Sequence, residues 1–170
     1  MTLKAMRRSA QKLEQEPCLK ILENGSYGIL ALSNPQGSYP IQIPLNYVLI
    51  DDTIYSHCAK QGEKLEAIKA NPSASFCVVS AWDVISEKLT TAYESVLCYG
   101  RMTVLRDESK RAPLLALCEK YAPMMDKEQI ERSIDASFDH VLVLALKIEE
   151  ISGKQGKERR KSQPDISCSL

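Results

Sequence analysis

Residues 54 to 65 are the part of the chain best suited to bind an anion. They read IYSHCAKQGEKL, in which an apolar strand ends at Ser56 and His57 and a loop through Gly62 leads to Lys64. A hydroxyl, an imidazole, an ammonium group and the first N–H groups of a following helix all donate hydrogen bonds that a phosphate accepts. The segment therefore predicts a phosphate site. A strand, a loop and a lysine occur together in many proteins, so a solvated Lys64 with a packed His57 stays open as the alternative.

No motif in the sequence supplies a complete catalytic apparatus. The chain contains no Walker motif, no G-x-G-x-x-G, no H-E-x-x-H and no G-x-S-x-G. With only His57 and His140, a histidine-rich metal site is excluded, and no local pattern supports a Ser-His-Asp triad. We therefore predict no metal site and assign no catalytic residue. Any demanding chemistry would need a borrowed cofactor.

Composition indicates one ordinary globular domain with a small-molecule ligand. The 170 residues carry 22 Lys and Arg against 22 Asp and Glu, so no net charge attracts nucleic acid or an anionic membrane. No apolar run approaches the roughly 20 residues of a membrane span, and no secretory signal follows the basic N-terminus. We expect a cytoplasmic protein.

The six cysteines form no C-x-x-C pair and mostly have apolar neighbours, which predicts reduced, buried thiols.

The pattern of elements favours a mainly β domain with peripheral helices. Hydrophobic patterning and turn residues predict six strands, at 27–33, 39–50, 53–57, 74–81, 91–105 and 141–151. Helical spacing predicts helices at 62–71, 108–121 and 126–133, with a weaker one at 9–24 and an irregular stretch at 82–89. Pro40 and Pro44 predict that one side of their strand lacks a neighbour for part of its length, and Gly100 predicts a bulge or barrel corner. Six strands in sequential hairpins indicate an antiparallel barrel. We assign residues 1–152 to this domain and 153–170 to a basic, Ser-rich, flexible tail.

The sequence resembles a known family over residues 20 to 154. The segment IYSHCAKQGEKLEAIKANPSASFCV is similar to the FMN phosphate-binding segment of the pyridoxamine phosphate oxidase-like split β-barrels, and most of all to their nitroimidazole-resistance branch. Four further segments agree in the expected order: GSYGILALS, YPIQIPLNYVLIDDTIYSH, TTAYESVLCYGRMTVL and ALKIEEISGK. The resemblance implies a six-stranded antiparallel split β-barrel of the FMN-binding type. It also implies a homodimer with FMN at the subunit interface.

The same resemblance assigns cofactor-binding roles to particular residues. Pro44, Leu45 and Asn46 would present backbone and side-chain groups to the isoalloxazine edge. The phosphate would be held by Ser56, His57 and Lys64, with help from the backbone at Cys58 and Ala59. Ser95, five residues before Gly100, would approach the ring or the phosphate.

The implied function is that of an FMN-dependent oxidoreductase reducing a small molecule, with nitroaromatics such as 5-nitroimidazoles as the substrates that the family suggests. The alternative is a non-catalytic flavin-binding or sensing module. The tail favours this alternative slightly, as does Glu63, which stands where the family often has an arginine. Oxidation of pyridoxamine phosphate itself is disfavoured, because the chain ends in SQPDISCSL and lacks that enzyme's Arg- and His-bearing signature. The sequence indicates neither the physiological substrate nor the electron donor.

Overall fold

A computed structural model describes residues 5–37 and 39–158. Its strands are β1 (Lys12–Leu13), β2 (Gly28–Leu32), β3 (Ile41–Leu45), β4 (Val48–Ile50), β5 (Thr53–Ala59), β6 (Ser73–Ile85), β7 (Thr90–Leu105) and β8 (Val141–Gln155). Its α-helices are α1 (Gln15–Asn24), α2 (Glu63–Ala70), α3 (Arg111–Tyr121) and α4 (Lys127–Ser137). Short 3₁₀ helices are η1 (Ser9–Gln11), η2 (Ser86–Lys88), η3 (Glu108–Lys110) and η4 (Phe138–His140).

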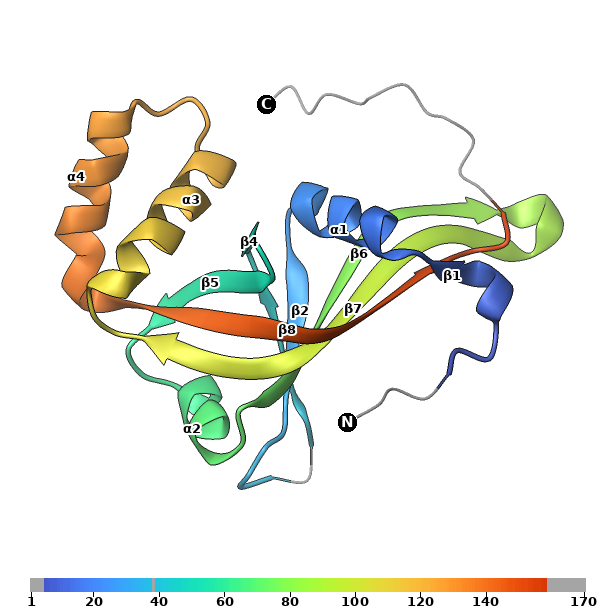
Figure 1. Ribbon diagram of the computed structural model, residues 1–170, viewed down its shortest axis with the longest axis horizontal. Coiled ribbons are helices and arrows are strands. Elements are labelled where there is room, and N and C mark those ends of the chain that lie inside the picture. The colour runs from blue at the N-terminus through green and yellow to red at the C-terminus, as the bar shows by residue number, and fades with distance from the viewer. Residues whose placement is uncertain (1–4, 38, 159–170) are drawn as a thin grey trace.

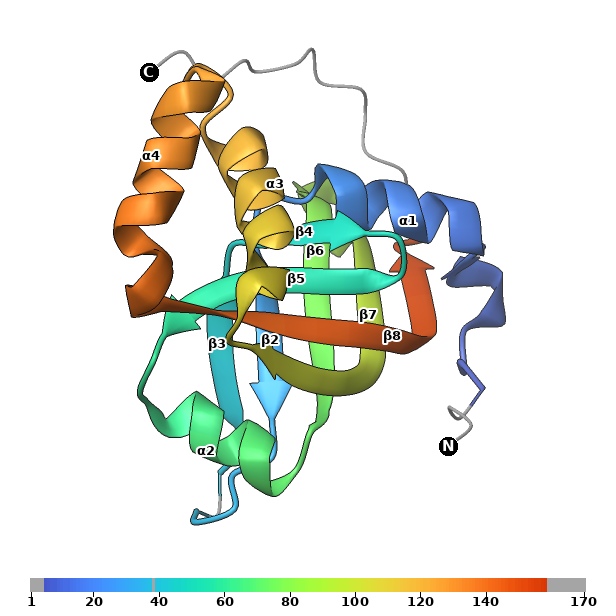
Figure 2. The same ribbon diagram turned by 60° about the vertical axis from the view of Figure 1, so that its left-hand side comes forward.

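The strands form one antiparallel sheet in the order β3-β2-β6-β7-β8-β5-β4, with β1 added beside β8. The sheet curls, so that β4, β5 and β8 cross in front of β2, β3 and β6 (Figure 2), while β7 bends round beside β8 (Figure 1). Its two end strands, β3 and β4, are separated along the chain only by Asn46 and Tyr47. The two ends of the sheet therefore meet at these residues, and we call this break the seam. The architecture is the split barrel expected from the sequence.

The expected number of strands was wrong, because the segment 39–50 is two strands rather than one. It is interrupted at Tyr47, whose side chain is fully buried and donates a hydrogen bond from its hydroxyl to the Leu22 carbonyl at 2.6 Å. The Tyr47 backbone N–H and carbonyl both bond to the Tyr121 hydroxyl, at 2.9 and 2.8 Å. The Tyr121 hydroxyl thus takes the hydrogen bonds that a neighbouring strand would make to the Tyr47 backbone, and the strand is interrupted at this residue. The two-residue β1 brings the total described to eight.

Two other boundaries differ from the sequence expectation because strand pairing extends them. The stretch expected to be irregular continues β6 to Ile85, which pairs with Thr90 of β7 in a long hairpin. The last strand runs past 151 to Gln155, which pairs with Glu94 of β7. The first residues of the predicted tail are therefore strand, and its residues 159–170 lie outside the described residues.

The predictions made from proline and glycine are confirmed. β3, which contains Pro44, is an end strand of the sheet, and among the described residues it pairs with β2 alone. The register between β7 and β8 shifts between Tyr99 and Gly100. A Cβ atom at Gly100 would lie 1.8 Å from the Lys147 carbonyl oxygen, so only glycine permits this close crossing of the two strands.

Two apolar clusters hold the fold together. The larger one fills the barrel and includes Leu30, Phe76, Val78, Val96 and Leu144 among its buried members. The smaller one lies outside the barrel, where α3 and α4 cover the outer face of the sheet; its buried members are Leu114, Ile130, Ile134 and Val143. Among the described residues, no helix is both long and apolar enough to cross a membrane.

Candidate functional site

Strand β5 divides the predicted phosphate residues between the inside and the outside of the barrel. Successive side chains of a strand point to opposite faces. Accordingly Ser56 is buried, with 3% of its surface exposed, whereas His57 is exposed. The Ser56 side chain lines a small space within the barrel core together with Leu30, Phe76 and Leu144. Ser56 therefore faces the barrel interior, on the opposite side of β5 from His57.

His57 and Asn46 meet in one cavity on the outside of the barrel. The cavity has a volume of about 390 Å³ and lies between β5, the seam and the helices α3 and α4. Asn46 is exposed in the seam, and Pro44 before it is exposed on β3. Leu45 is half-buried and faces the barrel interior beside Ser56. Of the three predicted ring-contacting residues, Pro44 and Asn46 therefore present side chains outward, and Leu45 could contribute only its backbone.

The backbone at the end of β5 is available to a ligand on one edge. β8 pairs with β5 from Thr53 to Ala59, but β4 pairs with the other edge only as far as Tyr55. Among the described residues, no strand pairs with Cys58 or Ala59 on that edge. The predicted role of these two residues, which rests on backbone groups, is therefore sterically open.

Two cations lie near the end of β5. Burial raises the pKa of the Cys58 thiol, and the positive charges of Lys64 and Arg106 lower it. Both side chains therefore lie near this thiol. Lys64 was predicted from the sequence, but Arg106 was not. The register explains its arrival: Leu105 of β7 pairs with Val143 of β8, which pairs with His57 of β5. Arg106 follows Leu105 directly, so the sheet brings it level with Cys58.

Helix α2 begins beside these cations without a side-chain cap. Its N-cap residue is Gly62, with a φ of 134°, a backbone conformation that only glycine adopts without strain. The carboxylate of Glu63 accepts a hydrogen bond from the Asn34 amide at 3.2 Å, which directs it toward the loop after β2. A phosphate would find suitable donors here in the backbone amides of the first turn of α2 and in the side chains of Lys64 and Arg106. The neighbouring carboxylate, that of Glu63, is hydrogen-bonded to Asn34 instead.

The seam is fixed in place by α3. The Lys120 ammonium donates to the Gly25 carbonyl at 2.7 Å and lies 4.3 Å from the centre of the Tyr47 ring. Burial lowers the pKa of Lys120. With the Tyr121 bonds to Tyr47, these contacts determine where Asn46 stands. Local sequence patterns contain no signal for these contacts, since Tyr121 lies 74 residues from Tyr47 and Lys120 lies 95 residues from Gly25.

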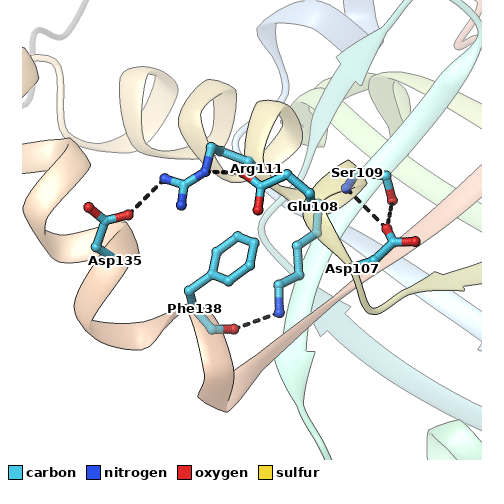
Figure 3. A network of polar contacts seen from close by, with 7 residues as sticks. Asp107, Glu108, Ser109, Arg111, Asp135 and Phe138 are labelled. Carbon is cyan, nitrogen blue, oxygen red and sulfur yellow. Dashed lines mark hydrogen bonds and ion pairs between the residues drawn. The ribbon is translucent and has the colours of Figure 1, made fainter.

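Helix α3 is in turn tied to α4 at its first turn (Figure 3). The Arg111 guanidinium bonds to Glu108 at 2.5 Å and to Asp135 of α4 at 2.8 Å. The Lys110 side chain is only 2% exposed and donates to the carbonyls of Phe138 and Val141, at 2.6 and 3.1 Å. The outer wall of the His57 cavity is thus a braced helix pair.

Ser95 is not brought to this site within one chain. It lies on β7 opposite Val79 of β6 and Lys154 of β8, ten residues before Leu105, the β7 residue level with His57. At about 3.3 Å per residue the two positions are near opposite ends of a long curved strand. Ser95 could meet the site only if a second copy of the chain supplied it.

Comparison with known proteins agrees with the fold. The chain is similar in structure to a candidate 5-nitroimidazole antibiotic resistance protein from Bacteroides thetaiotaomicron, with a TM-score of 0.68 at 19% identity, over 85% of this chain and 86% of that one. It is also similar to a conserved hypothetical protein from Mycobacterium tuberculosis, with a TM-score of 0.75 at 14% identity, over 95% and 99% of the two chains. A third such structure is the FAD and heme binding protein from Mycobacterium smegmatis, with a TM-score of 0.68 at 19% identity, over 90% and 76%.

These likenesses define the class as a split β-barrel. No curated protein matches the sequence significantly. The family model described as pyridoxamine 5'-phosphate oxidase matches residues 14–155. The chain belongs to this family.

Proposed function

We propose that the protein binds FMN as a homodimer and uses it to reduce a small organic molecule, with nitroaromatics such as 5-nitroimidazoles as the first substrates to test. The observation that carries the proposal is the cluster of donors at the end of β5: Lys64, Arg106 and the uncapped start of α2. Family membership and the flavin-binding protein among the similar structures support a flavin rather than another phosphate.

Each residue would have a defined task. Lys64 and Arg106 would hold the phosphate, with the backbone of Cys58 and Ala59 on the open edge of β5. Asn46 and Pro44 would lie along the ring, and His57 would be at most a proton donor. When bound in its reduced form, FMN supplies two electrons and two protons, enough to convert a nitro group to a nitroso group and water.

The outer face of the sheet supports the dimer. Its exposed apolar side chains lie on neighbouring strands: Val79, Trp82 and Val84 of β6 and Leu97 of β7. Ser95 lies between Val79 and Leu97 on this face, because cross-strand partners share a face. A second copy packed here would cover the apolar residues and present its Ser95 to the flavin. The five described cysteines are free, which accords with a reducing, cytoplasmic location as part of this proposal.

Flavin retention is the experiment that tests the proposal. We expect the purified protein, mixed with FMN and desalted, to keep flavin absorbance at about one FMN per chain. Lys64→Ala should weaken FMN binding about tenfold, since a hydrogen bond to a charged group contributes about 1.5–3 kcal/mol. Lys69→Ala, at the exposed end of the same helix, is the matched control and should bind as the parent does. A colourless protein would overturn the flavin assignment.

Turnover separates the enzyme from the alternative, a non-catalytic flavin module. The FMN-loaded protein, reduced chemically without oxygen, should be reoxidised by a nitroaromatic compound, with the flavin absorbance returning. Steady consumption of a nicotinamide donor with that acceptor would establish catalysis. Retained flavin that no nitro compound reoxidises would leave the binding module and exclude the nitroreductase.

A further inference from the structure

The cavity that contains Asn46 and His57 extends well beyond the predicted cofactor residues. Its other walls come from α3 and α4, and its lining includes Leu114, Leu117 and Ile134. Figure 2 shows the two helices side by side next to β5. The cavity borders the smaller apolar cluster, because Leu114 and Ile134 belong to both. This part of the cavity has no task in holding a flavin phosphate.

The chemical character of the lining selects the ligand. None of the described residues that line the cavity is Asp, Glu, Lys or Arg. The polar groups of the lining are the Asn46 amide, the His57 imidazole, the Cys118 thiol and the hydroxyls of Ser133 and Ser137. The remaining walls are aliphatic, apart from the Tyr121 ring. Burying an uncompensated charge against such walls is costly, whereas an apolar body with one or two polar substituents is well matched.

The volume sets the size of the ligand. Ligand pockets span about 300–1,000 Å³, and this cavity of about 390 Å³ lies at the small end of that range. One or two rings fit, but an additional nucleotide does not. The position next to Asn46 would put such a ligand beside the flavin ring.

We propose that this cavity binds an uncharged, mainly apolar molecule of one or two rings. In so far as it names the substrate class of the flavin chemistry, the inference rests on the proposed function. Phosphorylated and carboxylated molecules are then poor substrates. The wall formed by α3 and α4 sets this selectivity, and the cations Lys64 and Arg106 serve the cofactor alone.

A matched pair of fluorescent probes tests the inference. 2-Methoxynaphthalene is neutral and has two fused rings, and naphthalene-2-sulfonate has the same ring system with one negative charge. We expect the neutral probe to bind at least tenfold more tightly, with and without FMN. Equal binding, tighter binding of the sulfonate, or no binding of the neutral probe would overturn the inference.

Location is tested with variants on α4 and with a thiol. Ser133 is exposed at the surface and lines the cavity, whereas Ala136 on the same helix is exposed and does not line it. Ser133→Phe should fill the cavity and weaken binding of the neutral probe at least tenfold. Ala136→Phe should leave this binding unchanged, with circular dichroism confirming that both variants fold.

A thiol gives a second test that needs no variant. The bound probe should slow alkylation of Cys118 by iodoacetamide but not that of Cys77, measured by peptide mass spectrometry. Equal effects of the two variants, or an unprotected Cys118, would contradict the assignment.

The two proposals fail separately. A protein that retains no FMN but binds the neutral probe at Cys118 disproves the flavin function and leaves the cavity assignment intact. A protein that retains FMN and binds no neutral probe does the reverse.

Discussion

Arg106, the second cation that we propose to hold the phosphate, could not be chosen from the sequence. It follows a long strand with no motif around it, while its companion Lys64 stands in a recognisable loop. The two come together because β8 lies between β7 and β5 in a fixed register. That register depends on long-range pairing, which local patterns do not encode.

Arg106 can be tested through the phosphate alone. Arg106→Ala should weaken FMN binding about tenfold and leave binding of riboflavin, which lacks the phosphate, unchanged. Arg101→Ala is the control, because Arg101 is an exposed arginine of β7, the strand that Arg106 follows, and pairs with Lys147. Isothermal titration with both flavins gives the comparison. An equal loss for FMN and riboflavin would mean that Arg106 supports the fold rather than the phosphate.

The alternation of β5 sets the limit of prediction at the residue scale. Lys64 and His57 could be chosen from the sequence because their types suit a phosphate. Ser56 suits one equally well, but its neighbours on the same strand face are Ile54 and Cys58, which are buried with it. The opposite face carries Tyr55 and His57, so both faces mix polar and apolar residues. The sequence therefore could not decide which face enters the barrel.

One buried thiol makes stability depend on alkaline pH. Burial, with smaller contributions from Cys18 and Cys77, raises the pKa of Cys98 to about 12 from an ordinary value of 9.0. Because the pKa of this thiol is higher in the folded than in the unfolded protein, the neutral thiol contributes fully to the free energy of unfolding below pH 9. This contribution is lost as the pH rises toward 12. We expect the free energy of unfolding in urea to fall across this window, and Cys98→Ala to reduce the slope by up to about 1.4 kcal/mol per pH unit. Identical slopes would refute this.

At the scale of the elements, the packing of α3 against α4 is held by the buried side chain of Lys110. Lys110 sits at the junction of η3 and α3 and bonds to carbonyls at both ends of the turn from η4 into β8. Its ammonium also lies 4.1 Å from the centre of the Phe138 ring. A lysine is a rare residue at 2% exposure, and here its charge is compensated by these oxygens and the ring.

Removing that ammonium should destabilise the fold. Lys110→Met keeps the length of the side chain but leaves the carbonyls of Phe138 and Val141 without this donor, and we expect a loss of about 2 kcal/mol in the free energy of unfolding. Lys127→Met, at an exposed position that begins α4, should change it by less than about 0.5 kcal/mol. Urea denaturation measures both. Equal stability of the two variants would show that solvent replaces the ammonium.

Elements were predictable where local signals determine them. The sequence placed the start of α4 within a residue or two, and the structure shows a capping box formed by Asp126 and Gln129 there. It did not reveal the seam, because the interruption at Tyr47 depends on Tyr121, which lies 74 residues away. Nor did it reveal the full length of β6 and β8, where cross-strand pairing with β7 extends segments of weak local preference.

At the scale of the whole molecule, the apolar outer face is the feature that one chain leaves unexplained. Val79 is 54% exposed and Trp82 is 71% exposed, on adjoining positions of one face. The double variant with Val79→Lys and Leu97→Lys should convert the proposed dimer to a monomer and release FMN, since Ser95 of the second copy is then lost. Leu89→Lys, at a residue 96% exposed in the β6–β7 turn, is the control and should remain dimeric. Light scattering after size exclusion reports the mass, and a parent protein that is already monomeric would contradict the dimer.

The prolines of β3 have a consequence for how these molecules behave at high concentration. An unpaired strand edge ordinarily recruits strands from other chains and seeds cross-β assembly. Pro44 lies in β3, which has a strand neighbour on one side only within residues 5–37 and 39–158, and Pro40 directly precedes this strand. The free edge therefore offers fewer N–H groups to an incoming strand. The barrel can thus keep its seam open to a small molecule while discouraging polymerisation through the same opening.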